Sequence, residues 1–181
     1  MMEDLSLHVL DIAENAVAAD ATRITVFVNE NERRNLLMIR ISDNGRGMSK
    51  KDVRRAFDPF FSTKGKRTGF GLSFLSQAAE QCGGSLVLTS SPGRGTRVAA
   101  RFQSRHIDRP PLTSMARTMA TLVFGHPEID VRYRHRVNGR VFRFSSRAFL
   151  GGLHGAGFLS PDIFRGVKKA LRAGLARLGR S

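Results

Sequence analysis

Hydrophobic residues recur along the chain with two spacings, and these spacings predict alternating helices and strands. A helical spacing predicts helices over residues 4–19, 49–57, 71–82, 112–124 and from 160 to about 178. Alternation of apolar and polar residues predicts strands over residues 22–30, 35–42, 85–91, 96–103, 130–137 and 140–144. This order predicts an α/β fold, a two-layer sandwich in which helices cover one face of a mixed sheet.

Two consecutive prolines, Pro110 and Pro111, divide the chain, because such a pair interrupts regular secondary structure. We expect one domain over residues 1–104, a linker over 105–112 and a small, basic α+β extension over 113–181. Within the extension, Asn138-Gly139 separates two alternating segments and predicts a type I′ turn of a β-hairpin.

Positive charge is concentrated in the extension. The chain has 30 Lys and Arg against 15 Asp and Glu, a formal net charge of +15, and residues 104–181 contribute +11 of it (15 − 4). A solvated charged surface is the favoured interpretation. Contact of the basic extension with nucleic acid, with an anionic membrane or with an acidic protein is the alternative, and it is not favoured.

Other features of composition restrict the class of protein. The sequence shows no charged-then-apolar leader and no apolar run of about twenty residues, so we expect a cytoplasmic protein. The single cysteine, Cys82, excludes an internal disulfide and is expected to be a small core residue.

A candidate site begins on the first predicted helix. Asp11 and Asn15 are four residues apart on an apolar helical pattern, so they share one face of the helix. Mg²⁺ takes oxygen ligands and needs only one or two from the protein, and Asn15 offers such an oxygen without adding negative charge. Asp11 is placed to accept a proton from a water molecule or to orient it. Taken alone, both residues are better explained as polar residues on the surface of an amphipathic helix, and only the motifs further along the chain reverse this preference.

Two further segments add recognition of a base and of phosphate. Asp43 ends a predicted strand and is followed by Gly45 and Gly47; a carboxylate there can accept from the amine of adenine, and the glycines let the backbone approach a flat ring. Alone, Asp-Asn-Gly is also an ordinary turn signal. Gly69-Phe-Gly71-Leu72 begins a helix whose free amides attract phosphate, and the basic segment from Ser62 to Thr68 is expected to fold over it.

Five segments therefore occur in order: Asp11–Asn15, Asp43–Met48, Asp58–Lys64, Gly69–Leu72 and Gly93–Thr96. In this order and spacing they resemble the nucleotide-binding domain shared by gyrase, the Hsp90 chaperones, sensor histidine kinases and MutL, the GHKL family. The resemblance covers roughly residues 4–103 and is strongest to stand-alone domains of the histidine-kinase-like type. It implies a Bergerat-type fold, ATP or ADP as ligand and Mg²⁺ as cofactor.

The resemblance also implies roles for individual residues. Asn15 is then the magnesium ligand, Asp43 recognises adenine, and Thr96 helps to hold a water molecule beside the base. Residues 57–64 match the segment called the F box in histidine kinases, although its phenylalanines could equally be core aromatics. The remaining residues expected to bind nucleotide are Gly45, Gly47, Met48, Phe60, Thr68, Gly69, Phe70, Gly71 and Leu72.

The expected activity is that of an ATPase or a protein kinase, with Asp11 and Lys64 as catalytic residues. Histidine kinases usually have Asn at the position of Asp11, whereas gyrase-like and MutL-like ATPases have Glu there as general base. Only a few residues precede the first motif, and His8 lies on the same helix, so the phosphoacceptor is expected on a separate protein. The alternative is a regulatory module, similar to anti-sigma factors, in which bound nucleotide sets the affinity for a partner with little turnover. A homodimer is a further expectation left open, and a basic adaptor without nucleotide binding is disfavoured by the intact motifs.

Overall fold

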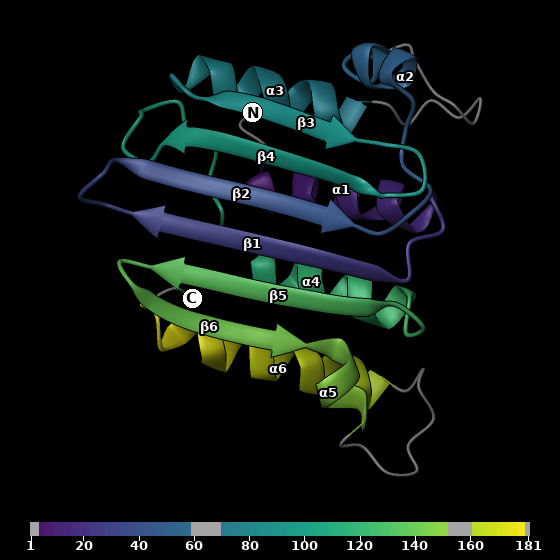
Figure 1. The fold of residues 1–181 in the computed structure, drawn as a ribbon. Coiled ribbons are helices and arrows are strands. Elements are labelled where there is room, and N and C mark those ends of the chain that lie inside the picture. Colours follow the sequence, from purple (N-terminus) through teal and green to yellow (C-terminus); the bar gives the residue numbers. More distant parts are fainter. Residues whose placement is uncertain (1–3, 59–69, 152–160, 180–181) are drawn as a thin grey trace.

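The computed structural model describes residues 4–58, 70–151 and 161–179, which form a six-stranded sheet with helices on one side (Figure 1). The strands are β1 (Arg23–Asn31), β2 (Leu36–Asp43), β3 (Ser85–Ser90), β4 (Thr96–Gln103), β5 (Asp130–Val137) and β6 (Arg140–Ser145), in the order β3-β4-β2-β1-β5-β6. The helices are α1 (Leu5–Val17), α2 (Lys50–Arg55), α3 (Phe70–Gln81), α4 (Met115–Gly125), α5 (Ser146–Gly151) and α6 (Pro161–Ala176). The predicted α/β fold, a mixed sheet covered on one face by helices, is confirmed.

The predicted elements are present with bounds shifted by up to three residues, and α5 is the addition. It has six residues and follows β6 directly, so it is too short to show a helical period in the sequence. The predicted hairpin turn is confirmed, because Asn138 and Gly139 have φ values of 48° and 95°. None of the described helices is long and apolar enough to cross a bilayer.

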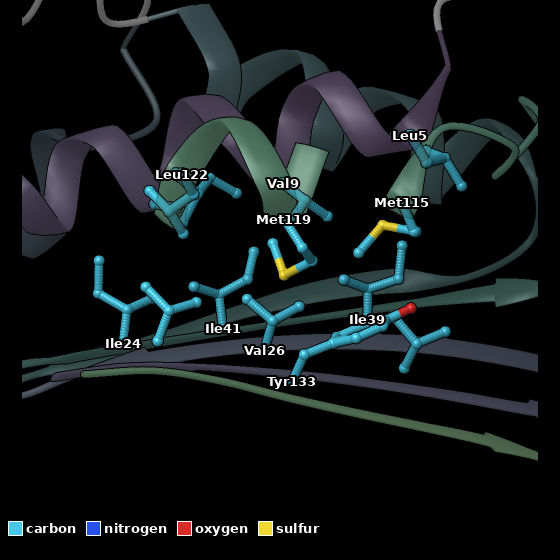
Figure 2. Close-up of a cluster of buried hydrophobic side chains, with 14 of the residues drawn as sticks. Leu5, Val9, Ile24, Val26, Ile39, Ile41, Met115, Met119, Leu122 and Tyr133 are labelled. Carbon is cyan, nitrogen blue, oxygen red and sulfur yellow. The ribbon is translucent and has the colours of Figure 1, made fainter. Parts of the chain in front are cut away.

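The inner face of the sheet is buried beneath α1 and α4 (Figure 2). Val26 lies opposite Ile41 of the antiparallel strand β2 and Tyr133 of the parallel strand β5, and all three side chains are buried. Leu5 and Val9 of α1 and Met119 of α4 pack on them (Figure 2). Because strand side chains alternate, every second residue of each strand points away from this core.

The extension continues the sheet rather than forming a separate layer. Strand β5 pairs in parallel with β1, and β6 pairs with β5. The apolar stripe of α6, including Val167 and Leu171, is buried against α4 and β6, so this helix packs on its own chain. The predicted domain boundary between residues 104 and 105 therefore falls within one continuous sheet, and both sides share one hydrophobic core.

The segment between β4 and α4 is held to the first helix. The N–H of Leu5 donates to the carbonyl of Pro111 (2.8 Å). Asp4 is the N-cap of α1, where its side chain accepts from the N–H of Ser6 (2.8 Å), and it also accepts from the hydroxyl of Thr113 (2.6 Å). One carboxylate thus joins the beginning of α1 to the beginning of the extension.

A buried hydrogen-bonded chain connects β1 with β5. Burial, with a smaller contribution from the charge of Glu30, raises the pKa of Tyr133 well above its usual value, so its hydroxyl stays protonated. The hydroxyl lies 2.6 Å from His135 Nδ1, and His135 Nε2 lies 2.8 Å from Glu30 Oε1. An ionised carboxylate only accepts, so His135 donates from Nε2 to Glu30, and a neutral His135 then accepts at Nδ1 from the hydroxyl of Tyr133. No motif in the sequence indicates this role for His135.

Replacing Tyr133 with phenylalanine should lower the free energy of unfolding by about 1–3 kcal/mol, because Nδ1 of the buried His135 loses its donor. Urea unfolding monitored by circular dichroism measures this loss. Glu30→Gln is the control: an amide oxygen can still accept from Nε2, so the loss should be smaller. An unchanged unfolding midpoint in Tyr133→Phe would contradict the assignment.

Candidate functional site

The exposed face of α1 carries the first two candidate residues. Burial of Leu5, Val9 and Ile12 fixes the rotation of the helix, and Asp11 and Asn15 consequently lie together on its exposed side. The predicted common face of these two residues is therefore present.

The first turn of α3 meets this face of α1. Gly71 is buried, and a Cβ built on it would lie 2.8 Å from the Cβ of Asp11 and 3.2 Å from its Oδ2. A side chain at position 71 would collide with Asp11, so glycine is what allows the two helices to approach. Asp11, the predicted proton acceptor, and Gly71, a predicted phosphate-binding glycine, thus meet in the fold although they are sixty positions apart in the sequence.

Asp43, the last residue of β2, is half-buried and firmly positioned. Its Oδ1 accepts from the N–H of Gly45 (2.8 Å) and from the N–H of Thr96 (3.2 Å). Burial raises the pKa of Asp43 above its ordinary value, and these two hydrogen bonds oppose the shift. Within the described part of the chain all its hydrogen bonds go to Oδ1, so Oδ2 is left as an acceptor for a ligand.

Two glycines bring the loop after β2 against the turn between β3 and β4. Gly47 has φ +68°, and a Cβ on it would lie 2.0 Å from the carbonyl oxygen of Ser91. Gly95 has φ +73°, and its Cβ would lie 2.1 Å from the carbonyl oxygen of Asp43. Both the positive φ and the contact exclude a side chain at these positions. Gly47 was expected to let the backbone approach a flat ring; in the structure its close backbone approach is to the protein's own turn between β3 and β4.

Two residues that the sequence pattern did not indicate hold these loops together. The hydroxyl of Ser90 accepts from the N–H of Met48 and lies 2.8 Å from the carbonyl of Gly95 and 3.0 Å from the hydroxyl of Thr96. Asn44 accepts from the backbone N–H of Thr22 and of Arg23, which ties the loop to the start of β1. Ser90 is an ordinary residue at the end of a strand and offers no motif. The sequence pattern around Asn44 indicates only a turn.

The remaining predicted residues are placed as follows. Gly45 and Thr96 donate to Asp43, and Gly47 and Met48 contact the turn between β3 and β4. Asp11 lies against Gly71 of α3, and Asn15 lies one helical turn further along the exposed side of α1. Phe70 begins α3, and Leu72 lies half-buried in its first turn. Phe60, Lys64, Thr68 and Gly69, together with the basic segment from Ser62 to Thr68, lie outside the described residues.

Two further features bear on ligands. A cavity of about 430 Å³ lies on the outer side of α3, lined by Phe57, Ser73, Ser76, Gln77, Glu80 and Leu86. It contains neither Asp43 nor Asp11, so the candidate site is distinct from it. Among the described residues no group of three or more His, Cys, Asp or Glu could hold a metal ion. Residues of α1 therefore fit Mg²⁺ only as a site with one or two protein oxygens, completed by phosphate and water.

Known proteins resemble the part of the chain that carries these residues. Residues 3–106 match the family model described as histidine kinase-, DNA gyrase B- and HSP90-like ATPase. The sensor histidine kinase ZraS of Escherichia coli O157:H7 is 30% identical over 93 residues, and the sensor protein kinase FleS of Pseudomonas aeruginosa is 40% identical over 88 residues. These alignments cover 51% and 49% of this chain. The chain spans only 20% and 22% of the length of these two relatives.

A solved structure shows the same fold over a longer part of the chain. The N-terminal domain of a DNA repair protein superimposes with a TM-score of 0.58 at 16% identity, covering 86% of this chain and 58% of that one. At this identity the likeness concerns the fold alone. With the family model matching more than half of its residues, the chain belongs to the family of histidine kinase-, DNA gyrase B- and HSP90-like ATPases.

Proposed function

We propose that this ATP-binding domain holds ATP with Mg²⁺ between α1, the beginning of α3 and the loop after β2, and that it hydrolyses the nucleotide or transfers its phosphoryl group to a separate protein. The observation that carries the proposal is the half-buried carboxylate of Asp43, fixed through Oδ1 by Gly45 and Thr96. The proposal assigns the protein to the cytoplasm, where ATP is supplied.

The base end of the nucleotide is assigned to Asp43. Adenine presents an amine at the position where guanine presents a carbonyl oxygen, so an ionised carboxylate accepts from adenine and repels guanine. Gly47 and Gly95 keep side chains away from the loops beside Asp43, and Met48 and Thr96 are fixed through Ser90. Base recognition is therefore supported by rigid surroundings, which reduces the ordering that binding would otherwise require.

The phosphate end is assigned to the beginning of α3 and to α1. The first amides of a helix attract phosphate oxygens, and Gly71 leaves the first turn of α3 without a side chain beside Asp11. We assign Mg²⁺ to Asn15, whose amide oxygen is exposed on the same face of α1. When bound, Mg²⁺ neutralises phosphate charge. Lys64 is proposed to neutralise further charge, and Phe60, Thr68, Gly69, Phe70 and Leu72 to complete the pocket.

Asp11 is proposed as the proton acceptor. In hydrolysis it would accept a proton from the attacking water, and in a kinase reaction it would orient the acceptor group of the partner protein. The alternative function, a nucleotide-gated regulatory module, needs binding but little turnover. The two differ in what Asp11 does, because aspartate is one methylene shorter than the glutamate of the gyrase-like ATPases.

Asp43→Asn should weaken ATP binding by about 10- to 100-fold, because an acceptor for the adenine amine becomes a donor. The affinity for GTP should rise, since the amide can donate to the guanine carbonyl. The free energy of unfolding should not fall. Because the pKa of Asp43 is raised in the folded protein, this residue favours folding below its ordinary pKa and loses that contribution as the pH rises. At pH 7 a neutral side chain therefore removes the cost of burying a charged carboxylate. Calorimetry with both nucleotides and a thermal melt measure these effects. Equal loss of ATP and GTP affinity would contradict base recognition by Asp43.

Asn15→Ala should abolish the difference in ATP affinity between buffers with and without Mg²⁺, because the metal loses its protein oxygen. The matched control is Glu14→Gln, which changes a neighbouring exposed residue of α1 that contacts His126. Calorimetric titration in Mg²⁺ and in EDTA gives the comparison. A magnesium effect that persists in Asn15→Ala would remove this residue from the site.

Asp11→Asn should leave ATP binding intact and reduce phosphate release or transfer by about 10²–10⁴-fold, the usual contribution of a general base. Incubation with labelled ATP, alone and with a lysate of the native host, separates hydrolysis, autophosphorylation and transfer. Glu14→Gln again serves as the control and should keep full turnover. Wild-type protein that binds ATP with no turnover in any of these conditions would favour the regulatory module instead.

A further inference from the structure

The described helices leave one face of the sheet open, and this face is turned toward the viewer in Figure 1. Exposed arginines of the strands lie on it. The strand registers show which residues share it: Phe27 lies between Arg40 of β2 and Arg134 of β5, and Arg143 of β6 lies beside Arg134. Alternation along each strand places the other outward residues on the same side. Eight exposed arginines belong to this open face: Arg23, Arg40, Arg97, Arg101, Arg132, Arg134, Arg136 and Arg143.

Carboxylates neutralise only one end of the open face. Asp130 accepts from Arg23 (3.1 Å) and Arg132 (2.9 Å), and although burial acts to raise its pKa, these two arginines hold it below the ordinary value. The other strand carboxylates, Glu30 and Asp43, belong to the inner side, since they lie opposite the buried residues Val137 and Ile24. Within the described part of the chain, the six remaining arginines form no ion pair.

At the centre of the open face, the aromatic ring of Phe27 contacts two of the arginines. The guanidinium carbons of Arg40 and Arg134 lie 5.1 Å and 5.3 Å from the centroid of Phe27. Arg134 also lies directly opposite Arg143, and like charges in that position destabilise a sheet. The fold therefore holds arginines close together, in fixed orientation, in the absence of any neutralising partner among the described strands. Such an arrangement is ready to bind a polyanion.

We propose that the open face binds single-stranded nucleic acid. The strands of the sheet carry no lysine, and arginine is the side chain whose planar fork matches phosphate and stacks on unpaired bases. Arg132, Arg134 and Arg136 alternate on β5 at intervals of about 6.7 Å, and neighbouring strands add further arginines at about 4.8 Å. Thr25, Ser42 and Asn29 lie between them and can hydrogen-bond to sugars and base edges.

The other polyanions fit this surface less well. Peripheral membrane binding needs exposed apolar side chains that enter the bilayer. On the open face Phe27 and Met38 are only partly exposed, Phe27 lies beneath two guanidinium groups, and the exposed Val87 lies on the edge strand β3. An acidic protein would need a continuous apolar centre for a stable interface, whereas Thr25, Asn29 and Ser42 stand around the partly buried Phe27. A DNA or RNA duplex is a stiff rod, so it can touch a broad flat array only along one line. A flexible single strand can follow arginines on several strands.

Binding can be measured by fluorescence anisotropy with labelled single-stranded RNA and DNA of about 16 nucleotides, and with the matching duplexes. ATP is omitted and Mg²⁺ is chelated, so a failure of the nucleotide pocket proposed above leaves this result unaffected. The test variant is Arg40→Gln with Arg134→Gln and Arg136→Gln. The matched control is Lys169→Gln with Arg172→Gln and Arg177→Gln, which removes the same charge from exposed positions of α6 and the turn after it.

The expected result is a loss of about tenfold in affinity for the single strand in the open-face variant and a decrease of about 2 in the slope of log K against log salt concentration. The α6 control should lose much less, and both proteins should melt at or above the wild-type temperature. Equal weakening in the two variants would show that only total charge matters and would overturn the proposal. So would tighter binding of the duplexes, of poly-glutamate or of phosphatidylserine vesicles than of the single strand.

A second variant tests the role of the ring. Phe27→Leu keeps every charge and an apolar side chain but removes the surface that orients Arg40 and Arg134. Affinity for the single strand should fall several-fold while the salt slope stays the same, because the number of phosphate contacts is unchanged. Unaltered affinity would show that the guanidinium groups need no orientation and would contradict the proposed array.

Discussion

The packing of α1 and α4 on the inner face of the sheet is the interaction on which the site depends. Leu5 and Val9 are fully buried, and a side chain of this size contributes about 1.5–3 kcal/mol when it leaves water. This burial fixes the rotation of α1, so Asp11 and Asn15 lie on its exposed side, where Asp11 meets the beginning of α3. The same contact decides which sheet face meets the helices and which stays open. The candidate nucleotide site and the basic face are therefore two consequences of one packing arrangement.

Backbone contacts between loops provide the second constraint. At Gly47 and Gly95 a side chain would lie about 2 Å from a carbonyl oxygen, which no local adjustment of a flexible neighbour relieves because that neighbour is main chain. These glycines allow the loop after β2 to lie on the turn between β3 and β4. Asp43 thereby receives an N–H from Gly45 on one side and from Thr96 on the other. A carboxylate held in this way can discriminate between bases, because it does not reorient to suit a wrong one.

The extension changes which strand lies at the edge of the sheet and how much charge its outer face carries. Without it, β1 would be an edge strand with unpaired backbone groups, and such edges favour association with other chains. Strand β5 pairs with β1, and α6 covers the added strands on the inner side. The extension also supplies half of the arginines of the open face. It therefore completes the core. It also adds positive charge to the open face, where residues 1–104 supply only the other half of the arginines.

The sequence by itself determined the local elements and the candidate chemistry, because both depend on short-range patterns. The spacing of hydrophobic residues predicted α1, β2 and α6, and Asn138-Gly139 predicted the hairpin. The order of the motifs indicated the ATPase family. Tertiary structure decided what depends on contacts between distant residues. It joined β5 to β1 in parallel, gave Ser90 and Asn44 their structural roles, and placed His135 between Tyr133 and Glu30. It also gathered arginines from β1, β2, β4, β5 and β6 on one face, since strand register is set by the common core and no single strand records it.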